Sequence, residues 1–133
     1  MAEATPATLE IAQQAFRHFS HGLATAEWEP FLAMLTDDFT FWFPVGAYKG
    51  LNVGKERAAS FFDFVSQVMD KGWTVTLQRV TSNETTVVFE FLSEGYLRGN
   101  PYQNQTAVSF DVSGDKICSY REYMAIVVPP KAD

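Results

Sequence analysis

The sequence has a single cysteine, Cys118, among its 133 residues. One cysteine cannot form an intramolecular disulfide or a cysteine-based metal cluster. Histidine is nearly as scarce: His18 and His21 are the two histidines, and two imidazoles without a third ligand are not a metal signature. We therefore expect no metal, no other cofactor and a reducing compartment, the cytoplasm.

Basic residues and long hydrophobic runs are also few. The chain has 10 Lys and Arg against 16 Asp and Glu, for a formal net charge of -6, which disfavours binding to the phosphates of nucleic acid. The longest apolar runs, such as residues 41–45, are far shorter than the roughly 20 residues of a membrane-spanning helix. The amino terminus lacks the basic start and apolar stretch of a secretion signal. We expect a cytoplasmic protein with neither a nucleic-acid nor a membrane partner.

Aromatic residues, by contrast, are abundant. The chain has 12 Phe, 5 Tyr and 3 Trp, and 47% of its residues are hydrophobic. Its length suits one domain, residues 1–133, with a sizeable core. This much aromatic bulk exceeds the usual needs of a small core and suggests a site that holds an apolar molecule.

Apolar residues at helical spacing predict three helices in the first half of the chain. The first runs from about residue 7 to residues 21–22, where Gly22 is a helix stop signal. The second is short, with Thr25 as its cap, Pro30 in its first turn and Leu35 on its apolar face, and Asp37-Asp38 end it. The third covers residues 55–69.

Alternating apolar and polar residues predict strands elsewhere. Residues 39–43 form the first strand, and a glycine-rich connection, 46–54, precedes the third helix. Four further segments separated by short turns should be antiparallel neighbours: 73–81, 85–97, 102–112 and 116–128. Helices followed by a run of strands indicate an α+β fold with the helices on one face of the sheet.

Several motifs together resemble the nuclear transport factor 2-like superfamily, in particular its ketosteroid isomerase and SnoaL-like polyketide cyclase branches. They are Trp28-Glu29-Pro30-Phe31, Phe43-Pro44-Val45-Gly46, Gly54-Lys55-Glu56-Arg57 and Tyr120-Arg121-Glu122-Tyr123. The resemblance implies one cone-shaped α+β domain over residues 1–133, with three N-terminal helices packed on a strongly curved, mostly antiparallel sheet that encloses a pocket. It also implies a homodimer formed through the outer face of the sheet.

The residues that ketosteroid isomerases use for catalysis are not present. Those enzymes place a general-base carboxylate and two acidic hydrogen-bond donors in an apolar site. In an ungapped alignment the base falls on Phe43, and the donors fall on Phe19 and Val108. These side chains cannot exchange a proton, so the resemblance implies the pocket without the standard isomerase chemistry.

Strand parity indicates which polar residues face the pocket. If Val108 points inward, so does Asn104, because residues two apart share a face. On the final strand the same alignment turns four residues inward: Cys118 as a small core residue, Tyr120, Glu122 and Met124. Burial would raise the pKa of Glu122 and make it a candidate acid or base.

Two alternatives stay open for these candidates. Glu122 could instead be a structural acid paired with Arg79 or Arg121. His18, beside Phe19 on the first helix, is a second catalytic candidate as a proton carrier at the pocket rim, or is a solvated helix-face residue. The predicted apolar walls of the pocket are Phe19, Trp42, Phe43, Phe61, Phe89, Val108 and Met124, and Asn104 and Tyr120 would orient the ligand.

The sequence therefore supports three hypotheses of function. The first is a SnoaL-like enzyme, a cofactor-independent isomerase, cyclase or hydrolase that acts by general acid/base chemistry on a polycyclic, polyketide-like or terpenoid compound. The second is a non-catalytic carrier of a small apolar molecule. The third is a structural dimerisation domain.

Overall fold

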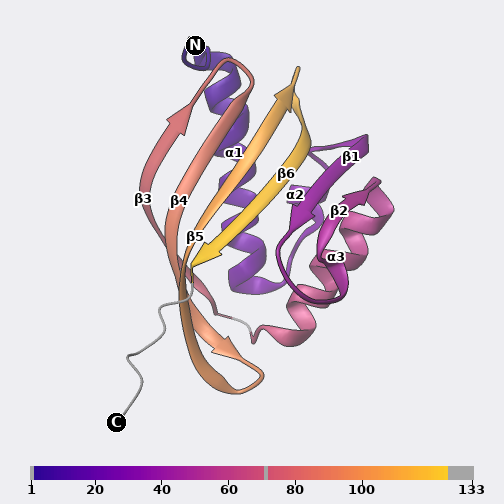
Figure 1. Ribbon diagram of the computed structural model, residues 1–133, viewed down its shortest axis with the longest axis vertical. Helices are drawn as coiled ribbons and strands as arrows, with labels where there is room; N and C mark the ends of the chain where they lie inside the picture. The colour runs from indigo at the N-terminus through magenta and orange to yellow at the C-terminus, as the bar shows by residue number, and fades with distance from the viewer. Residues whose placement is uncertain (1, 71, 126–133) are drawn as a thin grey trace.

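The computed structural model describes residues 2–70 and 72–125, which form three helices on one face of a six-stranded sheet (Figure 1). The helices are α1 (Pro6–Thr25), α2 (Glu29–Leu32) and α3 (Lys55–Val68), with a short 3-10 turn, η1 (Gly46–Tyr48). The strands are β1 (Leu35–Phe43), β2 (Gly50–Val53), β3 (Thr74–Ser82), β4 (Thr86–Leu97), β5 (Asn100–Ser113) and β6 (Lys116–Ala125). The predicted α+β class is confirmed. In these ranges no helix is long and apolar enough to cross a membrane.

The sheet is open, curved and mostly antiparallel, as predicted. Its strand order is β2-β1-β6-β5-β4-β3, and β1 runs parallel to β6 while the other described neighbours are antiparallel. The sequence pattern missed β2 and predicted a glycine-rich connection there. A four-residue strand is too short for a periodic signal, and β2 is fixed instead by Asn52, whose side-chain amide donates to the backbone oxygens of Tyr48 and Gly50.

Helix α1 continues through Gly22, where we had expected it to end. A Cβ atom on Gly22 would lie 2.4 Å from the Trp28 ring, so glycine is needed there for close packing. Thr25 does not cap the second helix. Its hydroxyl donates to the backbone oxygen of His21 in the last turn of α1 and accepts from the Glu27 amide, while Trp28 occupies the N-cap position of α2.

Strand β1 begins four residues earlier than expected, at Leu35. Leu35 is fully buried and pairs with Ile117 of β6, and the Ile117 amide donates to the backbone oxygen of Met34. This parallel pairing, which joins distant parts of the chain, makes the segment a strand. Asp37 and Asp38 therefore lie exposed within β1 and do not end a helix.

The core between α1 and the sheet consists largely of aromatic rings. Phe16 of α1 stacks on Phe89 of β4 with ring centroids 4.4 Å apart, and Phe19 contacts rings from α2, α3, β4, β5 and β6. Close packing of aromatic pairs adds to the free energy of apolar burial. One end of the cone is filled by this core.

A β-bulge in β6 changes the facing of Cys118. Asp111 pairs with Ser119 and Val112 pairs with Ile117, so Cys118 is an extra residue on its strand. Ile117 is fully buried in the core, whereas Cys118 is half-buried. The prediction that Cys118 faces the core was wrong, because the bulge shifts the parity.

Candidate functional site

A cavity of about 230 Å³ lies at the other end of the cone, between α3, the last turns of α1 and the concave face of β4, β5 and β6. The end of α3 is fastened to the β4–β5 hairpin. The Arg98 amide donates to the backbone oxygen of Val68, and the Asp70 amide donates to that of Tyr96. These bonds hold the helix over the sheet and keep the space beneath it.

Most of the predicted site residues lie on this cavity. Phe19 comes from α1, Phe43 from the end of β1 and Phe61 from α3. The sheet contributes polar groups alternating with apolar ones, as expected of residues two apart on a strand. The predicted residues on the cavity wall are Phe19, Phe43, Phe61, Asn104, Tyr120, Glu122 and Met124.

Four predicted site residues lie elsewhere. Trp42 faces away from the cavity and stacks on Tyr123 at 5.3 Å, since adjacent strand residues point to opposite faces and Phe43 already faces inward. Phe89 and Val108 do face inward, but they are buried in the aromatic core under α1. His18 is half-buried on α1 and does not line the cavity.

The sequence reasoning found Phe61 of α3 but missed the other cavity residues of that helix. Apolar residues at helical spacing, which predicted this helix, are the signal of a core-facing helix and do not distinguish a core from a cavity wall. The further cavity residues on α1, α3 and the following segments are Leu23, Phe62, Phe64, Val65, Val68, Met69, Trp73 and Leu97.

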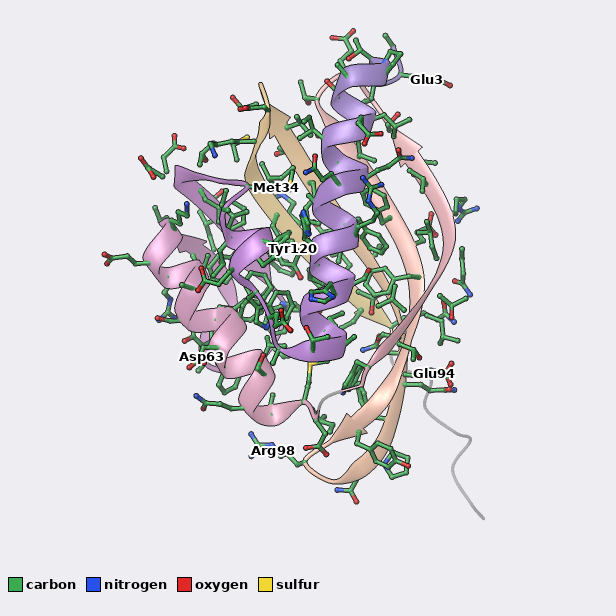
Figure 2. All side chains as sticks on the ribbon, turned by 180° about the vertical axis from the view of Figure 1, so that it is seen from behind. Glu3, Met34, Asp63, Glu94, Arg98 and Tyr120 are labelled. Carbon is green, nitrogen blue, oxygen red and sulfur yellow. The ribbon has the colours of Figure 1, made fainter. Side chains whose placement is uncertain are left out.

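The Tyr120 hydroxyl donates a hydrogen bond to Oε1 of Glu122, two residues along β6. Tyr120 is fully buried and lies between the helices and the sheet (Figure 2), while Glu122 is half-buried on the cavity wall. The other carboxyl oxygen, Oε2, has no hydrogen-bond partner among the described residues. The pair therefore presents one free carboxyl oxygen to an apolar space.

The environment changes the ionisation of both groups. Burial raises the pKa of Glu122 from 4.5 to about 7, and the hydrogen bond from Tyr120 offsets part of this effect. Burial, followed by the charge of Glu122, raises the pKa of Tyr120 well above its usual value. Near neutral pH, Glu122 is populated in both protonation states and Tyr120 keeps its proton.

Neither of the two salt bridges considered in the alternative interpretation of Glu122 is formed. Arg79 makes two hydrogen bonds of 2.7 and 2.8 Å to Glu90, both on the outer face of the sheet, and this contact lowers the pKa of Glu90. Arg121 is exposed on that same face. Glu122 is thus a carboxyl without a cationic partner in the described part of the chain.

A second polar group lies on the cavity wall at β4 and β5. Oδ1 of Asn104 accepts hydrogen bonds from Ser93 and Thr106, and its amide nitrogen donates to the Tyr102 hydroxyl. Residues 2–70 and 72–125 contain no group of three or more side chains arranged to hold a metal ion. The chemistry that the described residues offer is proton transfer and hydrogen bonding.

The helices packed on a curved, open sheet, with a cavity beneath them, define a protein of the nuclear transport factor 2-like class. The sequence model of the SnoaL-like domain matches residues 16–120. The chain belongs to the SnoaL-like family. A search of curated proteins gave no significant match.

Solved structures agree with this assignment. The chain is 60% identical to an NTF2-like protein from Anabaena variabilis, with 94% of each chain covered and a TM-score of 0.89. It shares its fold with a SnoaL-like polyketide cyclase from Jannaschia sp., at 18% identity, 98% and 100% coverage and a TM-score of 0.76. An epoxide hydrolase from M. tuberculosis matches at 19% identity, 87% and 84% coverage and a TM-score of 0.68.

Proposed function

We propose that the protein binds a small apolar molecule in this cavity and transforms it by general acid/base chemistry at Glu122. The observation that carries the proposal is a carboxyl with a pKa of about 7, held by Tyr120 on the wall of an otherwise mainly apolar cavity. A general acid or base works best when its pKa lies near the operating pH. No metal or organic cofactor is needed for this chemistry.

Tyr120 acts as a positioning residue for Glu122. Its hydroxyl donates to Oε1, which leaves Oε2 as the atom that takes a proton from the bound molecule or returns one to it. The apolar surroundings exclude water, so the carboxylate form is a stronger base than it would be in solution. Isomerisation, cyclisation and hydrolysis by an activated water all contain such a proton transfer.

The size of the cavity narrows the class of ligand. A cavity of 150 Å³ holds benzene, so about 230 Å³ accommodates roughly ten non-hydrogen atoms. This size supports a monoterpenoid or a short polyketide fragment. A polycyclic compound of steroid size would extend beyond the cavity, so among the substrates that the sequence suggested we favour the smaller ones.

Proton abstraction from 5-nitrobenzisoxazole tests the proposal without knowledge of the natural substrate. This neutral bicyclic compound opens to a coloured phenolate when a base removes one carbon-bound proton. We expect the wild-type protein to catalyse the opening and Glu122→Gln to lose at least roughly a hundredfold in rate. Glu94→Gln is the matched control, because Glu94 is exposed on the outer face (Figure 2). Equal rates for wild type and Glu122→Gln would refute the catalytic role.

A carrier without catalysis is the second candidate. The observation in its favour is that the three positions aligned with the catalytic residues of ketosteroid isomerases are the apolar residues Phe19, Phe43 and Val108. Tight binding of a ligand that is recovered unaltered, together with no opening of 5-nitrobenzisoxazole, would favour the carrier. The open cavity argues against a purely structural domain, in which aromatic side chains would fill this space.

We also propose that two copies pair through the convex face of the sheet. Leu51, Val53 and Tyr123 are 65%, 66% and 50% exposed there, and Tyr123 stacks on Trp42. Large exposed apolar side chains gathered on one face are typical of protein interfaces. A two-fold pair would bring this face against itself and leave the cavities, on the opposite face, accessible.

A further inference from the structure

Four polar side chains form a cluster on the cavity wall, apart from the Tyr120–Glu122 pair. Ser93 and Asn104 face each other across β4 and β5, and Tyr102 and Thr106 lie two residues to either side of Asn104. The exposed fractions of Ser93, Asn104 and Thr106 are 4%, 7% and 6%. These three buried polar groups need hydrogen-bond partners from the protein or from a bound molecule. Tyr102 is half-buried.

The hydrogen bonds within the cluster leave two hydrogens without an acceptor. Ser93 and Thr106 each use their only hydroxyl hydrogen on Oδ1 of Asn104, at 2.7 and 2.5 Å. The Asn104 amide has two hydrogens and donates one of them to the Tyr102 hydroxyl at 3.3 Å. The second amide hydrogen and the Tyr102 hydroxyl hydrogen have no acceptor among the described residues. The cluster is therefore an unfilled hydrogen-bond donor.

The charge of the cavity restricts what can accept these bonds. Neither Lys, Arg nor His is among the described residues on the wall, and Glu122 is the single carboxyl there. An anionic ligand would lose its hydration without gaining a counter-charge, and it would lie in the same cavity as Glu122. A neutral oxygen, such as that of a carbonyl, can accept both hydrogen bonds without this penalty.

We propose that Tyr102 and Asn104 anchor the ligand by its oxygen, and that the cavity selects neutral molecules with a carbonyl-type acceptor at one end of an apolar body. This inference rests on the proposed function, since it assigns the ligand class of the same cavity. Ser93 and Thr106 are positioning residues that hold the Asn104 amide with its nitrogen toward the ligand. Tyr102 and Asn104 determine which ligands bind, whereas Glu122 acts on the ligand once it is bound.

The distance between the cluster and Glu122 separates these two roles. Glu122 is paired with Val108, four residues along β5 from Asn104, which is about 13 Å of strand at roughly 3.3 Å per residue. Curvature of the sheet shortens the path through the cavity. The anchored oxygen is thus several bonds from the atom whose proton Glu122 exchanges, and Tyr102 and Asn104 position the ligand without activating that atom.

Four ligands that share a 4-isopropylphenyl body and differ in one end group test the selection. They are 4-isopropylbenzaldehyde, 4-isopropyltoluene, 4-isopropylbenzoate and 4-isopropylbenzylamine. We expect the aldehyde to bind roughly 5- to 30-fold more tightly than the hydrocarbon, because it gains one or two hydrogen bonds. The benzoate should bind more weakly than both. The aldehyde should also shift the side-chain amide signal of Asn104 in a ¹⁵N NMR spectrum.

Variants assign the discrimination to the cluster. Tyr102→Phe keeps the ring and removes one donor, so it should weaken aldehyde binding roughly fivefold and leave the hydrocarbon unchanged. Tyr96→Phe, on an exposed tyrosine of the β4–β5 hairpin outside the cavity wall, is the control. The variant Glu122→Gln should keep the preference for the aldehyde, because Glu122 does not anchor the oxygen.

Equal affinity for aldehyde and hydrocarbon, or unchanged aldehyde binding by Tyr102→Phe, would overturn the inference. Tightest binding of the amine would also overturn it, since the Glu122 carboxylate would then be the anchor. If any of these three results accompanies normal opening of 5-nitrobenzisoxazole, the anchoring role fails while the proposed function stands. If none of the four compounds binds and the probe is not opened, both fail.

Discussion

Glu122 is ionised less readily in the folded protein than in the unfolded chain, because the cavity hydrates a carboxylate poorly. Its pKa is about 7 in the fold against an ordinary value of 4.5. At a pH between these two pKa values, the native state holds a proton that the unfolded state has released. The free energy of unfolding therefore decreases as the pH rises. A pKa difference of this size changes the free energy of unfolding by at most about 3 kcal/mol.

We predict that this pH dependence disappears in Glu122→Gln, which cannot ionise but still accepts the hydrogen bond from Tyr120. The stability of wild type relative to the variant should fall by up to about 3 kcal/mol between about pH 4.5 and pH 7.5. Urea unfolding of both proteins across this range measures the difference. The other carboxyl groups are the same in both proteins, so their contributions cancel. A difference that stays constant with pH would show that Glu122 is not perturbed.

Single residues were predictable where strand parity held. Asn104, Tyr120 and Glu122 were placed on the inner face by a period of two, and all three line the cavity. Cys118 was misplaced because a bulge leaves no signal in the pattern of apolar residues. The alternative in which Arg79 pairs with Glu122 could not be decided from the sequence, because the strand face that Arg79 occupies depends on a second bulge in β3, between Leu77 and Arg79.

The contact between α1 and α2 depends on a glycine. Trp28 lies against Gly22 and packs at a tilt on the Phe62 ring of α3, with ring centroids 4.5 Å apart. Its ring nitrogen donates to the Ser66 hydroxyl at 2.7 Å. The indole is held on several sides and cannot move aside easily. The same ring connects α2 to α3, the helix that covers the cavity.

We predict that Gly22→Ala destabilises the protein by about 1–2 kcal/mol. Alanine improves helix propensity by about 1 kcal/mol, but its overlap with Trp28 costs about 1–3 kcal/mol. Because the Trp28 ring cannot move aside easily, we expect a cost near the upper end of this range. Thermal or urea unfolding measures the change, with Gln14→Ala on the exposed side of α1 as control. A stabilised Gly22→Ala would mean that Trp28 moves aside and that packing does not require the glycine.

Elements with strong periodicity were predicted well, and those fixed by distant contacts were not. The bounds of α3, β3 and β4 follow their apolar patterns to within one or two residues. Strand β1 starts early because it pairs with β6, some 80 residues away in the chain, and β2 is too short to carry a pattern. The predicted end of the last strand, residues 126–128, lies outside the described residues.

At the scale of the whole molecule, the proposed dimer predicts a measurable change in mass. Tyr123→Glu places a charge among the exposed apolar residues of the convex face, and in a two-fold pair both copies would bring this charge into the interface, so the variant should be monomeric at micromolar concentration. Sedimentation velocity or native mass spectrometry distinguishes the two states. Ser60→Glu, on the exposed side of α3, adds the same charge away from this face and should stay dimeric. A monomeric wild-type protein would refute the dimer.

The order of helices and strands was enough to predict the architecture, because helices followed by an antiparallel run of strands have few ways to bury their apolar faces. The location of the cavity was not predictable from the order alone. Phe16 and Phe89 fill one end of the cone, whereas the end near Trp73 and Met69 stays open, and both ends are lined by the same residue types.

The pH dependence of 5-nitrobenzisoxazole opening tests whether Glu122 is the working base of the cavity. The wild-type rate should rise with pH through a midpoint of about 7, where the carboxylate forms, and the protein-dependent rate should be absent in Glu122→Gln across the whole range. A midpoint near 4.5, or the same profile in Glu122→Gln, would place the base elsewhere and contradict the proposed function.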